Sequence, residues 1–150
     1  MKWMLIVLGA LAVLVVLVAA IGSRLPREHV ASRTLRVRRT PQEVWAAVTQ
    51  ATAASSVPVD VLEQDPPRRQ VTRVKESEKM FGGTWTIAIE PDPSTSSGQA
   101  CTLTITENGW VANPIFRFVS RFVMGHHATI DGVLKQVATA LNGQPVLSGE

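Results

Sequence analysis

The sequence predicts an α+β fold: an antiparallel sheet of about five strands covered by a long C-terminal helix and preceded by one transmembrane helix. Three observations lead to this prediction. Residues 4–22 form an unbroken apolar run. Between residues 29 and 111, apolar and polar residues alternate in several segments, at the period of a strand. Residues 113–142 instead repeat apolar residues at the spacing of a helix.

The apolar run contains no charged or polar side chain, and Lys2 and Trp3 precede it. A run of this length can cross a hydrocarbon core about 30 Å thick, and a tryptophan suits the membrane interface. Signal peptides have a shorter apolar stretch, of roughly 7–15 residues. The sequence therefore favours an uncleaved anchor at residues 1–23, with a cleaved signal sequence as the alternative.

Arginine is concentrated after this run, because residues 24–39 hold six arginines and one acid, Glu28. By the positive-inside tendency, this excess favours a cytoplasmic C-terminal domain, with export as the alternative. Arg24 and Arg27 lie nearest the run and are expected to contact lipid head groups. The four later arginines fit the solvent side of a strand instead.

A short linker at residues 24–28 leads into residues 29–39, which alternate as a first strand. A short helix follows, since Thr40 suits its N-cap and Pro41 its first turn. Glu43 stands three residues after Thr40 and completes a capping box. The helix is expected to fade in the alanine- and serine-rich stretch that comes next.

Four further strands are expected, each with one apolar face and each joined to the next by a short connection. They are residues 57–64, 69–76, 84–90 and 101–111. Short connections imply that neighbouring strands are antiparallel. One apolar face per strand implies a sheet that is solvated on one side and covered by helices on the other.

The C-terminal helix is expected to begin at Asn113, a good N-cap residue, with Pro114 in the first helical position. Asn142 and Gly143 provide a stop signal, and residues 143–150 are expected to be disordered. A helix of this length would span roughly 45 Å at 1.5 Å per residue. Its apolar stripe consists of Ile115, Val119, Phe122, Val123, His126, Ile130, Val133, Leu134, Val137 and Leu141.

The composition excludes several classes of site. With Lys2 set aside, 14 of the 15 basic residues remain against 12 acidic ones, a net charge of +2, which argues against nucleic-acid binding. Cys101 is the single cysteine, so it forms no internal disulfide and is expected to be a small buried residue. His126 and His127 are adjacent, and a helix would point them about 100° apart. No metal site and no cofactor is therefore predicted.

Several motifs follow one another in an informative order. Residues 39–45 read Arg-Thr-Pro-Gln-Glu-Val-Trp at the junction of a predicted strand and helix. Further segments are residues 65–68, 81–86, 103–107 and 113–118, with Gly125, His126, Ala128 and Thr129 in the closing helix. Together, over residues 29–142, these motifs resemble the START-like superfamily, the SRPBCC group that includes polyketide cyclase/dehydrase-like proteins.

The resemblance implies a helix-grip fold, in which a curved sheet wraps a long C-terminal helix and leaves a hydrophobic cavity between them. It also implies binding of an apolar small molecule, such as a lipid, sterol or polyketide, and a minority of members are enzymes. This chain departs from the family pattern, because two strands and a small helix are missing between Ala51 and Val57. The shortened sheet would leave the grip open or close it by collapse. It would also bare an edge for pairing with a second copy as a homodimer.

The residues expected to contact a ligand are apolar and aromatic side chains of the sheet and the helices, with one histidine. They are Trp45, Phe81, Trp85, Val119, Phe122, His126 and Ile130. The aromatic members equally suit an ordinary core, since a small domain must bury its aromatic residues. His126 is expected either to be a buried histidine with one hydrogen bond or to orient a polar group of the ligand.

Three functions are open at this point. The first is a membrane-anchored domain that buries an apolar ligand between sheet and C-terminal helix without catalysis. The second is an enzyme of the cyclase/dehydratase type with His126 or Glu107 as its acid or base. The third is a truncated, cavity-less module that is tethered to the membrane and binds another protein. The size and lining of the space under the C-terminal helix distinguish them.

Overall fold

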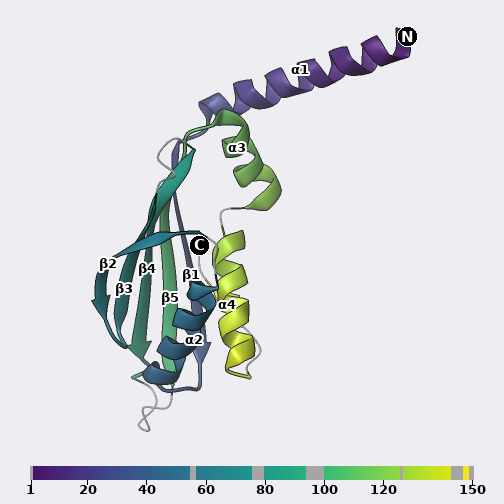
Figure 1. The fold of residues 1–150 in the computed structure, drawn as a ribbon. Coiled ribbons are helices and arrows are strands. Elements are labelled where there is room, and N and C mark those ends of the chain that lie inside the picture. The colour runs from purple at the N-terminus through teal and green to yellow at the C-terminus, as the bar shows by residue number, and fades with distance from the viewer. Residues whose placement is uncertain are drawn as a thin grey trace.

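The computed structural model describes residues 2–54, 57–75, 80–93, 100–125, 127–142 and 147–148. The α+β class is confirmed: helices cover one face of an antiparallel sheet, and an apolar helix extends from the N-terminal end (Figure 1). The helices are α1 (Lys2–Arg24), α2 (Pro41–Ala53), α3 (Pro114–Val119), the π-helical turn η1 (Ser120–Met124) and α4 (Ala128–Ala140). The strands are β1 (Glu28–Val37), β2 (Val59–Asp65), β3 (Arg69–Val74), β4 (Phe81–Pro91), β5 (Cys101–Val111) and β6 (Leu147–Ser148).

The sheet has the strand order β2-β3-β4-β5-β1-β6, and every pair of neighbours is antiparallel. The five longer strands correspond to the predicted ones, with small shifts at their ends. The short β6 differs from the predicted disordered tail, because Leu147 and Ser148 pair with Leu35 and Thr34 of β1. The other residues of that predicted tail lie outside the described residues.

Two predicted helix starts are confirmed in atomic detail. At α2, the Thr40 hydroxyl accepts a hydrogen bond from the Glu43 amide at 3.4 Å, and the Glu43 carboxylate accepts one from the Thr40 amide at 2.9 Å. At α3, the side-chain oxygen of Asn113 accepts hydrogen bonds from the amides of Ile115 and Phe116. Both caps satisfy amide groups that the first helical turn leaves without a backbone partner.

The core fills the space between α2, α4 and the inner face of β1, β4 and β5. An ion pair between Arg33 on β1 and Asp131 on α4, at 3.2 Å, closes one side of this space. The largest fully buried side chains are Leu35, Ile87, Leu103, Ile105, Ile130 and Leu134. The centre of the grip is therefore occupied by protein side chains.

The outer part of the sheet extends beyond this cover. Every residue of β2 is exposed, and on β2 the register shifts between Val61 and Glu63, as at a β-bulge. Val59 and Val61 expose about half of their surface, although valine usually lies inside a domain. The helices thus leave this outer part of the sheet uncovered.

The predicted continuous C-terminal helix is wrong. It divides into α3 with η1 and, after a break, α4, because Gly125 has φ 76° and ψ 146°, outside the helical region. Glycine reaches a positive φ without the steric penalty of a side chain. The two halves also have different partners, since α4 packs on α2 and the sheet whereas α3 packs on α1. Helical spacing alone does not reveal this change of partner.

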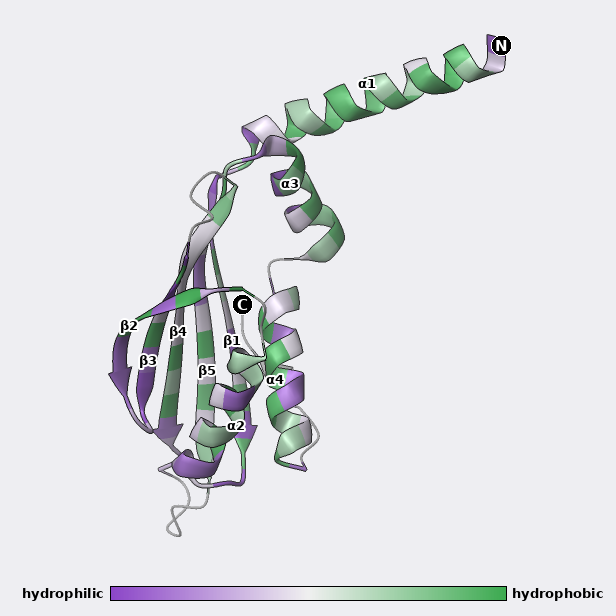
Figure 2. Ribbon diagram, viewed as in Figure 1, coloured by the Kyte–Doolittle hydropathy of each residue, from purple (hydrophilic) through white to green (hydrophobic). Residues whose placement is uncertain are grey.

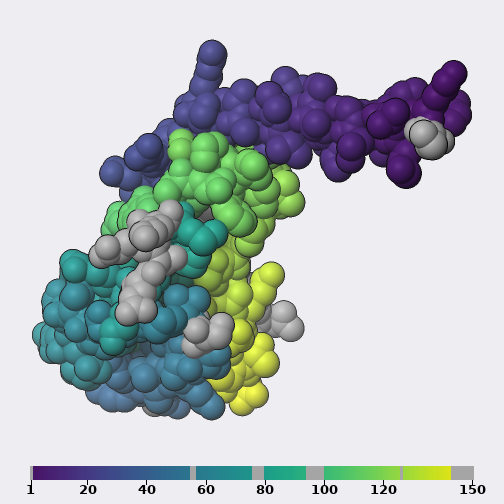
Figure 3. Space-filling model, turned by 45° about the horizontal axis from the view of Figure 1, so that its top comes forward, coloured from purple at the N-terminus to yellow at the C-terminus, as the bar shows by residue number. Residues whose placement is uncertain are grey.

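Helix α1 projects from the body, and its C-terminal part lies against α3 (Figure 3). Apolar residues cover it along almost its whole length (Figure 2), and its side chains are largely exposed. By length and composition α1 could cross a membrane, a criterion that signal sequences also meet. Gly22 at its end is buried, and a Cβ there would collide with the carbonyl oxygen of Pro114, so this glycine permits the close approach of α1 and α3.

Candidate ligand-binding site

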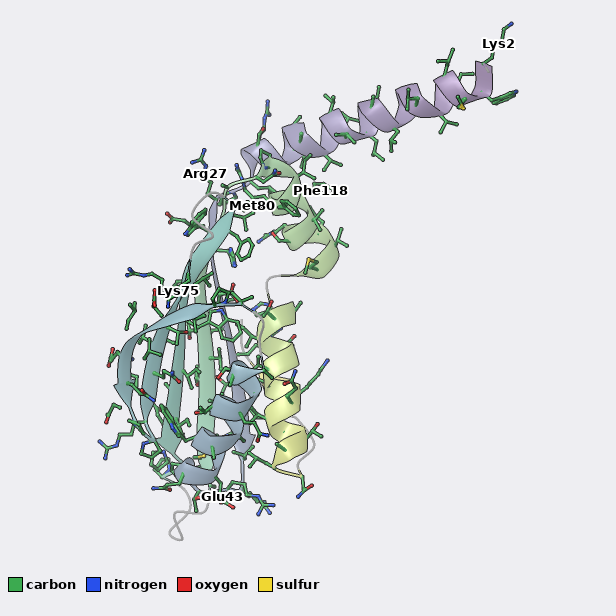
Figure 4. All side chains as sticks on the ribbon, viewed as in Figure 1. Lys2, Arg27, Glu43, Lys75, Met80 and Phe118 are labelled. Atoms are coloured by element: carbon green, nitrogen blue, oxygen red, sulfur yellow. The ribbon has the colours of Figure 1, made fainter. Side chains whose placement is uncertain are left out.

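An open cleft of about 320 Å³ lies near the junction of α1 and α3, away from the filled centre of the grip. Ligand pockets commonly measure about 300–1,000 Å³, so this cleft lies at the lower end of that range. Its apolar lining comes from Met80, Phe81, Trp110, Val111, Phe116, Val119 and Met124. Its polar lining includes His29, Glu107, Ser120 and Thr129. Figure 4 shows Met80 and Phe118 close to this junction, with Lys2 at the far end of α1.

The cleft is built where β4 begins and β5 ends, with α3 and η1 across its opening. Gly82 and Trp110 face each other in the register of these strands. A Cβ at Gly82 would lie 2.8 Å from the Trp110 ring, so the glycine leaves room for the indole. Phe116 and Val119, one helical turn apart, present their side chains to the cleft from α3.

A histidine and a carboxylate form the polar part of the lining. His29 Nε2 lies 3.6 Å from Glu107 Oε1, and the two side chains are 16% and 21% exposed. His29 is paired across the sheet with Gly109, where a Cβ would lie 2.5 Å from the imidazole Cε1. The missing side chain at Gly109 therefore gives His29 the space to lie beside Glu107. Glu107 Oε2 is buried and has no hydrogen-bond partner in the described part of the chain.

A smaller hollow of about 160 Å³ adjoins the cleft and shares His29 with it. It is bordered by Arg117, which is only 7% exposed. Arg117 Nη1 donates a hydrogen bond to the Leu25 carbonyl at 3.0 Å, and Nη2 donates one to the Ala112 carbonyl at 2.9 Å. Arg117 thereby joins the segment that leaves α1 to the end of β5.

The structure separates the residues that were predicted to contact a ligand. Phe81 and Val119 line the cleft. Trp45 and Trp85 are partly buried against the core, and Ile130 is fully buried within it. Phe122 does not line the cleft: it is 59% exposed, and its ring centre lies 4.9 Å from that of Phe118. His126, the remaining predicted residue, lies outside the described residues.

Two residues of this region could not be identified from sequence reasoning. His29 approaches Glu107 only through the pairing of β1 with β5, which a single sequence does not disclose. Gly109 near the end of a threonine-rich strand is the one signal in the sequence, since a glycine there often marks close approach. The charge of Arg117 favours the solvent side of the helix, although the residue is buried.

Neither a thiol nucleophile nor a metal centre emerges from the geometry. Cys101 is buried as predicted, and burial together with the nearby negative charge of Glu43 raises its pKa to about 11. The thiol therefore stays protonated at neutral pH. Among the residues that the structure describes, no group of three or more His, Cys, Asp or Glu side chains could hold a metal ion. For the cyclase/dehydratase hypothesis, Glu107 lies in the cleft and His126 is not described.

No protein-family model and no curated protein matches the chain. Solved structures do match. A conserved protein from Geobacillus kaustophilus aligns with a TM-score of 0.55 and 11% identity, over 81% of this chain and 100% of that one. A protein from Mesorhizobium loti aligns with a TM-score of 0.53 and 12% identity, over 77% and 97%. A norcoclaurine synthase from Thalictrum is more distant, with a TM-score of 0.44 and 11% identity over 75% and 95%.

The fold is a START-like helix-grip. The resemblance read from the sequence motifs is therefore confirmed at the level of the fold. At identities of 11–12%, the START-like fold carries no statement about activity or ligand, because one fold hosts many functions. Function has to be argued from the cleft and from α1.

Proposed function

We propose that the chain is a membrane-anchored START-like domain that binds a hydrophobic small molecule or lipid in the cleft beneath α3 and η1. The observation that supports this proposal is the apolar lining of the cleft by Phe81, Phe116 and Val119, with His29 and Glu107 beside it. A largely apolar pocket with a few convergent polar groups is the usual form of a small-molecule site.

The proposed site differs from the one expected for the family. The space between α4 and the sheet holds the buried side chains of Ile130, Leu134 and Val137. The break at Gly125 separates α3 and η1 from this filled region. Ligand binding is therefore assigned to the end of the grip that adjoins α1.

Membrane anchoring rests on α1. Its apolar side chains are exposed over a length that could cross a bilayer, and an exposed apolar surface of this extent needs an apolar environment. Arg24 and Arg27 follow the helix and are both exposed. These cations favour a cytoplasmic domain under the positive-inside tendency.

Native mass spectrometry of the full-length chain, released from detergent micelles, tests the proposal. Val119→Trp would fill the cleft, whereas Val123→Trp changes a residue of the same segment that is 72% exposed and does not line the cleft. We expect a lipid or other apolar adduct on the wild-type chain and on Val123→Trp, and its loss from Val119→Trp. Lipids that merely surround α1 would persist in all three proteins. Absence of any adduct sensitive to Val119→Trp would refute the proposal.

A second candidate function is protein interaction through the edge strand β2. Its seven residues are all exposed, and it ends the sheet without an outer neighbour in the described residues. Open edges of this kind pair with further strands, so a homodimer is the expected assembly. Val61→Lys should convert such a dimer to a monomer in sedimentation of the detergent-solubilised chain. Val30→Lys, which changes another exposed valine, on β1 at the opposite side of the sheet, should leave the mass unchanged if β2 forms the interface.

A further inference from the structure

We propose that the His29–Glu107 pair receives the polar end of the ligand, and that this end is a hydrogen-bond donor, either a hydroxyl or an ammonium group. This inference rests on the proposed binding of a hydrophobic ligand and names the chemical class of that ligand. It assigns an amphipathic molecule to the cleft, with its apolar part along Phe81, Phe116 and Val119.

The first support is the position of the pair. Both residues line the same apolar cleft, although they come from different strands. Their side chains are mostly buried and retain a small exposed fraction. A polar pair in such surroundings interacts more strongly with a ligand than it would in water, because the local dielectric constant is lower.

The second support is the unused capacity of the carboxylate. Glu107 Oε1 lies 3.6 Å from His29 Nε2, longer than the 2.7–3.2 Å of a good hydrogen bond. Oε2 is buried and has no hydrogen-bond partner in the described ranges. A small rotation of the carboxylate toward a ligand would therefore break no hydrogen bond to Oε2. A buried acceptor without a donor is unfavourable, and a donor group on the ligand would relieve that cost.

The third support is that glycine shapes this position. A Cβ at Gly109 would lie 2.5 Å from His29 Cε1 and 3.2 Å from Glu107 Oε1. The space above Gly109 thus holds both members of the pair. Gly109→Ala should displace them while leaving the apolar lining in place.

The negative charge of the Glu107 carboxylate determines which polar groups of a ligand it can bind. An ionised carboxylate only accepts hydrogen bonds, so it favours hydroxyl and ammonium donors. It disfavours a ligand that ends in its own carboxylate, because two like charges would share a weakly solvated site. Long-chain alcohols and amines therefore fit the cleft better than fatty acids of equal length.

Four probes with the same eighteen-carbon chain test this inference: octadecanol, octadecylamine, octadecanoic acid and octadecane. Each is added at equal mole fraction to the full-length chain in micelles, and the bound fraction is measured by native mass spectrometry. We expect the alcohol and the amine to bind at least about tenfold better than the acid, the size of effect that one charge-assisted hydrogen bond provides. Glu107→Leu should abolish this preference. Glu107→Gln should weaken binding of the amine more than binding of the alcohol, because the ammonium group loses its charged partner. Binding of octadecane should not change.

The matched control is Glu90→Gln, which alters an exposed glutamate of β4 outside the cleft and should preserve the preference. Gly109→Ala provides an independent variant if Glu107→Leu does not fold, as judged by circular dichroism. Equal binding of all four probes, unaffected by Glu107→Gln, would overturn the assignment of the polar end while leaving hydrophobic binding intact. Failure of every probe to bind would overturn the proposed function itself.

A separate observation leads to a second inference: we infer that α3 and η1 rest in the head-group region of the bilayer that α1 crosses. Ile115, Phe122 and Val123 are exposed apolar residues that do not line the cleft. Ile115 follows directly on Pro114, which lies against Gly22 at the end of α1. Phe122 and Val123 lie in η1, which continues from α3. The apolar surface of the anchor thus continues onto this segment.

Basic residues accompany this surface, as expected at an anionic membrane. Arg24, Arg27 and Arg121 are all exposed, and Figure 4 shows Arg27 near the end of α1. Amphipathic segments that lie in the interface combine an apolar face with such cations. A bilayer with anionic lipid is therefore the occupant that fits this surface, in preference to a second copy of the chain.

Fluorescence quenching tests the second inference with an environment-sensitive dye on Val123→Cys, in nanodiscs that contain phosphatidylserine and nitroxide-labelled phosphatidylcholine. Lys135→Cys, on the exposed side of α4, is the matched control, and the wild-type chain measures any labelling of the buried Cys101. We expect quenching at position 123 to be at least about twofold stronger than at position 135. A nitroxide on a lipid quenches only a dye that lies close to it, and so reports a dye at the membrane. Equal quenching at both positions would overturn the inference, and protection of position 123 by self-association would identify a second copy as the occupant.

Discussion

Arg117 shows how a single residue connects the proposed anchor to the domain. Its two hydrogen bonds, to the carbonyls of Leu25 and Ala112, hold the segment after α1 against the end of β5. The Val111 amide reinforces the same junction by donating a hydrogen bond to the Arg27 carbonyl at 2.9 Å. A buried charge is stable only while polar partners compensate for the water it has lost. Removing either the guanidinium or the carbonyls that bind it would therefore destabilise the fold.

Arg117→Met should therefore destabilise the protein by about 2–4 kcal/mol, because two partly buried carbonyls would lose their charged donor. Thermal unfolding of the full-length chain in detergent, followed by circular dichroism, measures the effect. Arg38→Met is the control, since Arg38 is exposed and should change stability by less than about 0.5 kcal/mol. Equal melting temperatures for the two variants would show that the junction contributes little.

Cys101 should react slowly with alkylating reagents. Its pKa is raised from 9.0 to about 11 by burial and then by the charge of Glu43. At pH 8 the thiolate fraction falls by about a hundredfold relative to an unshifted thiol, and the alkylation rate by at least as much. Comparing the alkylation of native and urea-unfolded protein measures this difference. A native rate close to the unfolded rate would contradict the burial of the thiol.

The same shift has a consequence for stability. The folded state keeps the proton of Cys101 to a higher pH than the unfolded state does, so its contribution is complete below pH 9 and is lost as the pH rises toward 11. Cys101→Ala should remove this part of the pH dependence between pH 9 and 11. Denaturant unfolding of both proteins across that range measures it.

Residues differ in how far their roles could be predicted from the sequence. The burial of Cys101 follows from strand alternation, and the caps at Thr40 and Asn113 follow from local residue preferences. The pairing of His29 with Glu107 does not, because it depends on the register of two strands that are distant in the chain. Local chemistry is readable from sequence, whereas a site assembled by tertiary pairing is not.

At the scale of elements, the break between η1 and α4 determines where the cleft lies. The helical period continues through Gly125, so the sequence predicted one helix. The strands were predicted more successfully. One face of the sheet packs on the core and the other faces solvent, so apolar and polar residues alternate along each strand. The break arises because α3 packs on α1 whereas α4 packs on α2 and the sheet. Such tertiary contacts leave no pattern in the local sequence.

Gly125→Ala and Gly132→Ala should have opposite effects on stability. Gly125 has φ 76° and ψ 146°, a backbone region used almost only by glycine, and an alanine held there costs about 1–3 kcal/mol. Gly132 lies within α4, and nothing lies within 4 Å of the position that an added Cβ would take, so alanine there should stabilise the helix by about 0.5–1 kcal/mol. Urea unfolding of both variants measures the two changes. Stabilisation by Gly125→Ala would indicate that α3, η1 and α4 can join into the continuous helix that the spacing suggests.

At the scale of the whole molecule, α1 and the rest of the domain are connected through side-chain and backbone contacts as well as through the chain. Sequence reasoning predicted both parts but could not predict that α1 packs on α3. Because α3 also lines the cleft, this contact brings the cleft, the exposed residues of α3 and the end of α1 with its arginines close together. If α1 crosses a bilayer as proposed, a ligand that partitions into that bilayer would meet the cleft without crossing bulk water.

The α1–α3 contact depends on Gly22, so Gly22→Val should separate the two helices without removing the anchor. A Cβ there would collide with the Pro114 backbone, which cannot move aside as a flexible side chain can. Gly9→Val is the matched control, because it makes the same change within α1 at a position with nothing within 4 Å. In nanodiscs, trypsin should cleave after Arg24 or Arg27 several-fold faster in Gly22→Val than in Gly9→Val, since the linker would lose its support on α3 and Arg117. If both variants were cleaved at the wild-type rate, the linker would be held independently of the α1–α3 contact, and the hydrogen bond from Arg117 to the Leu25 carbonyl would be the support that remains.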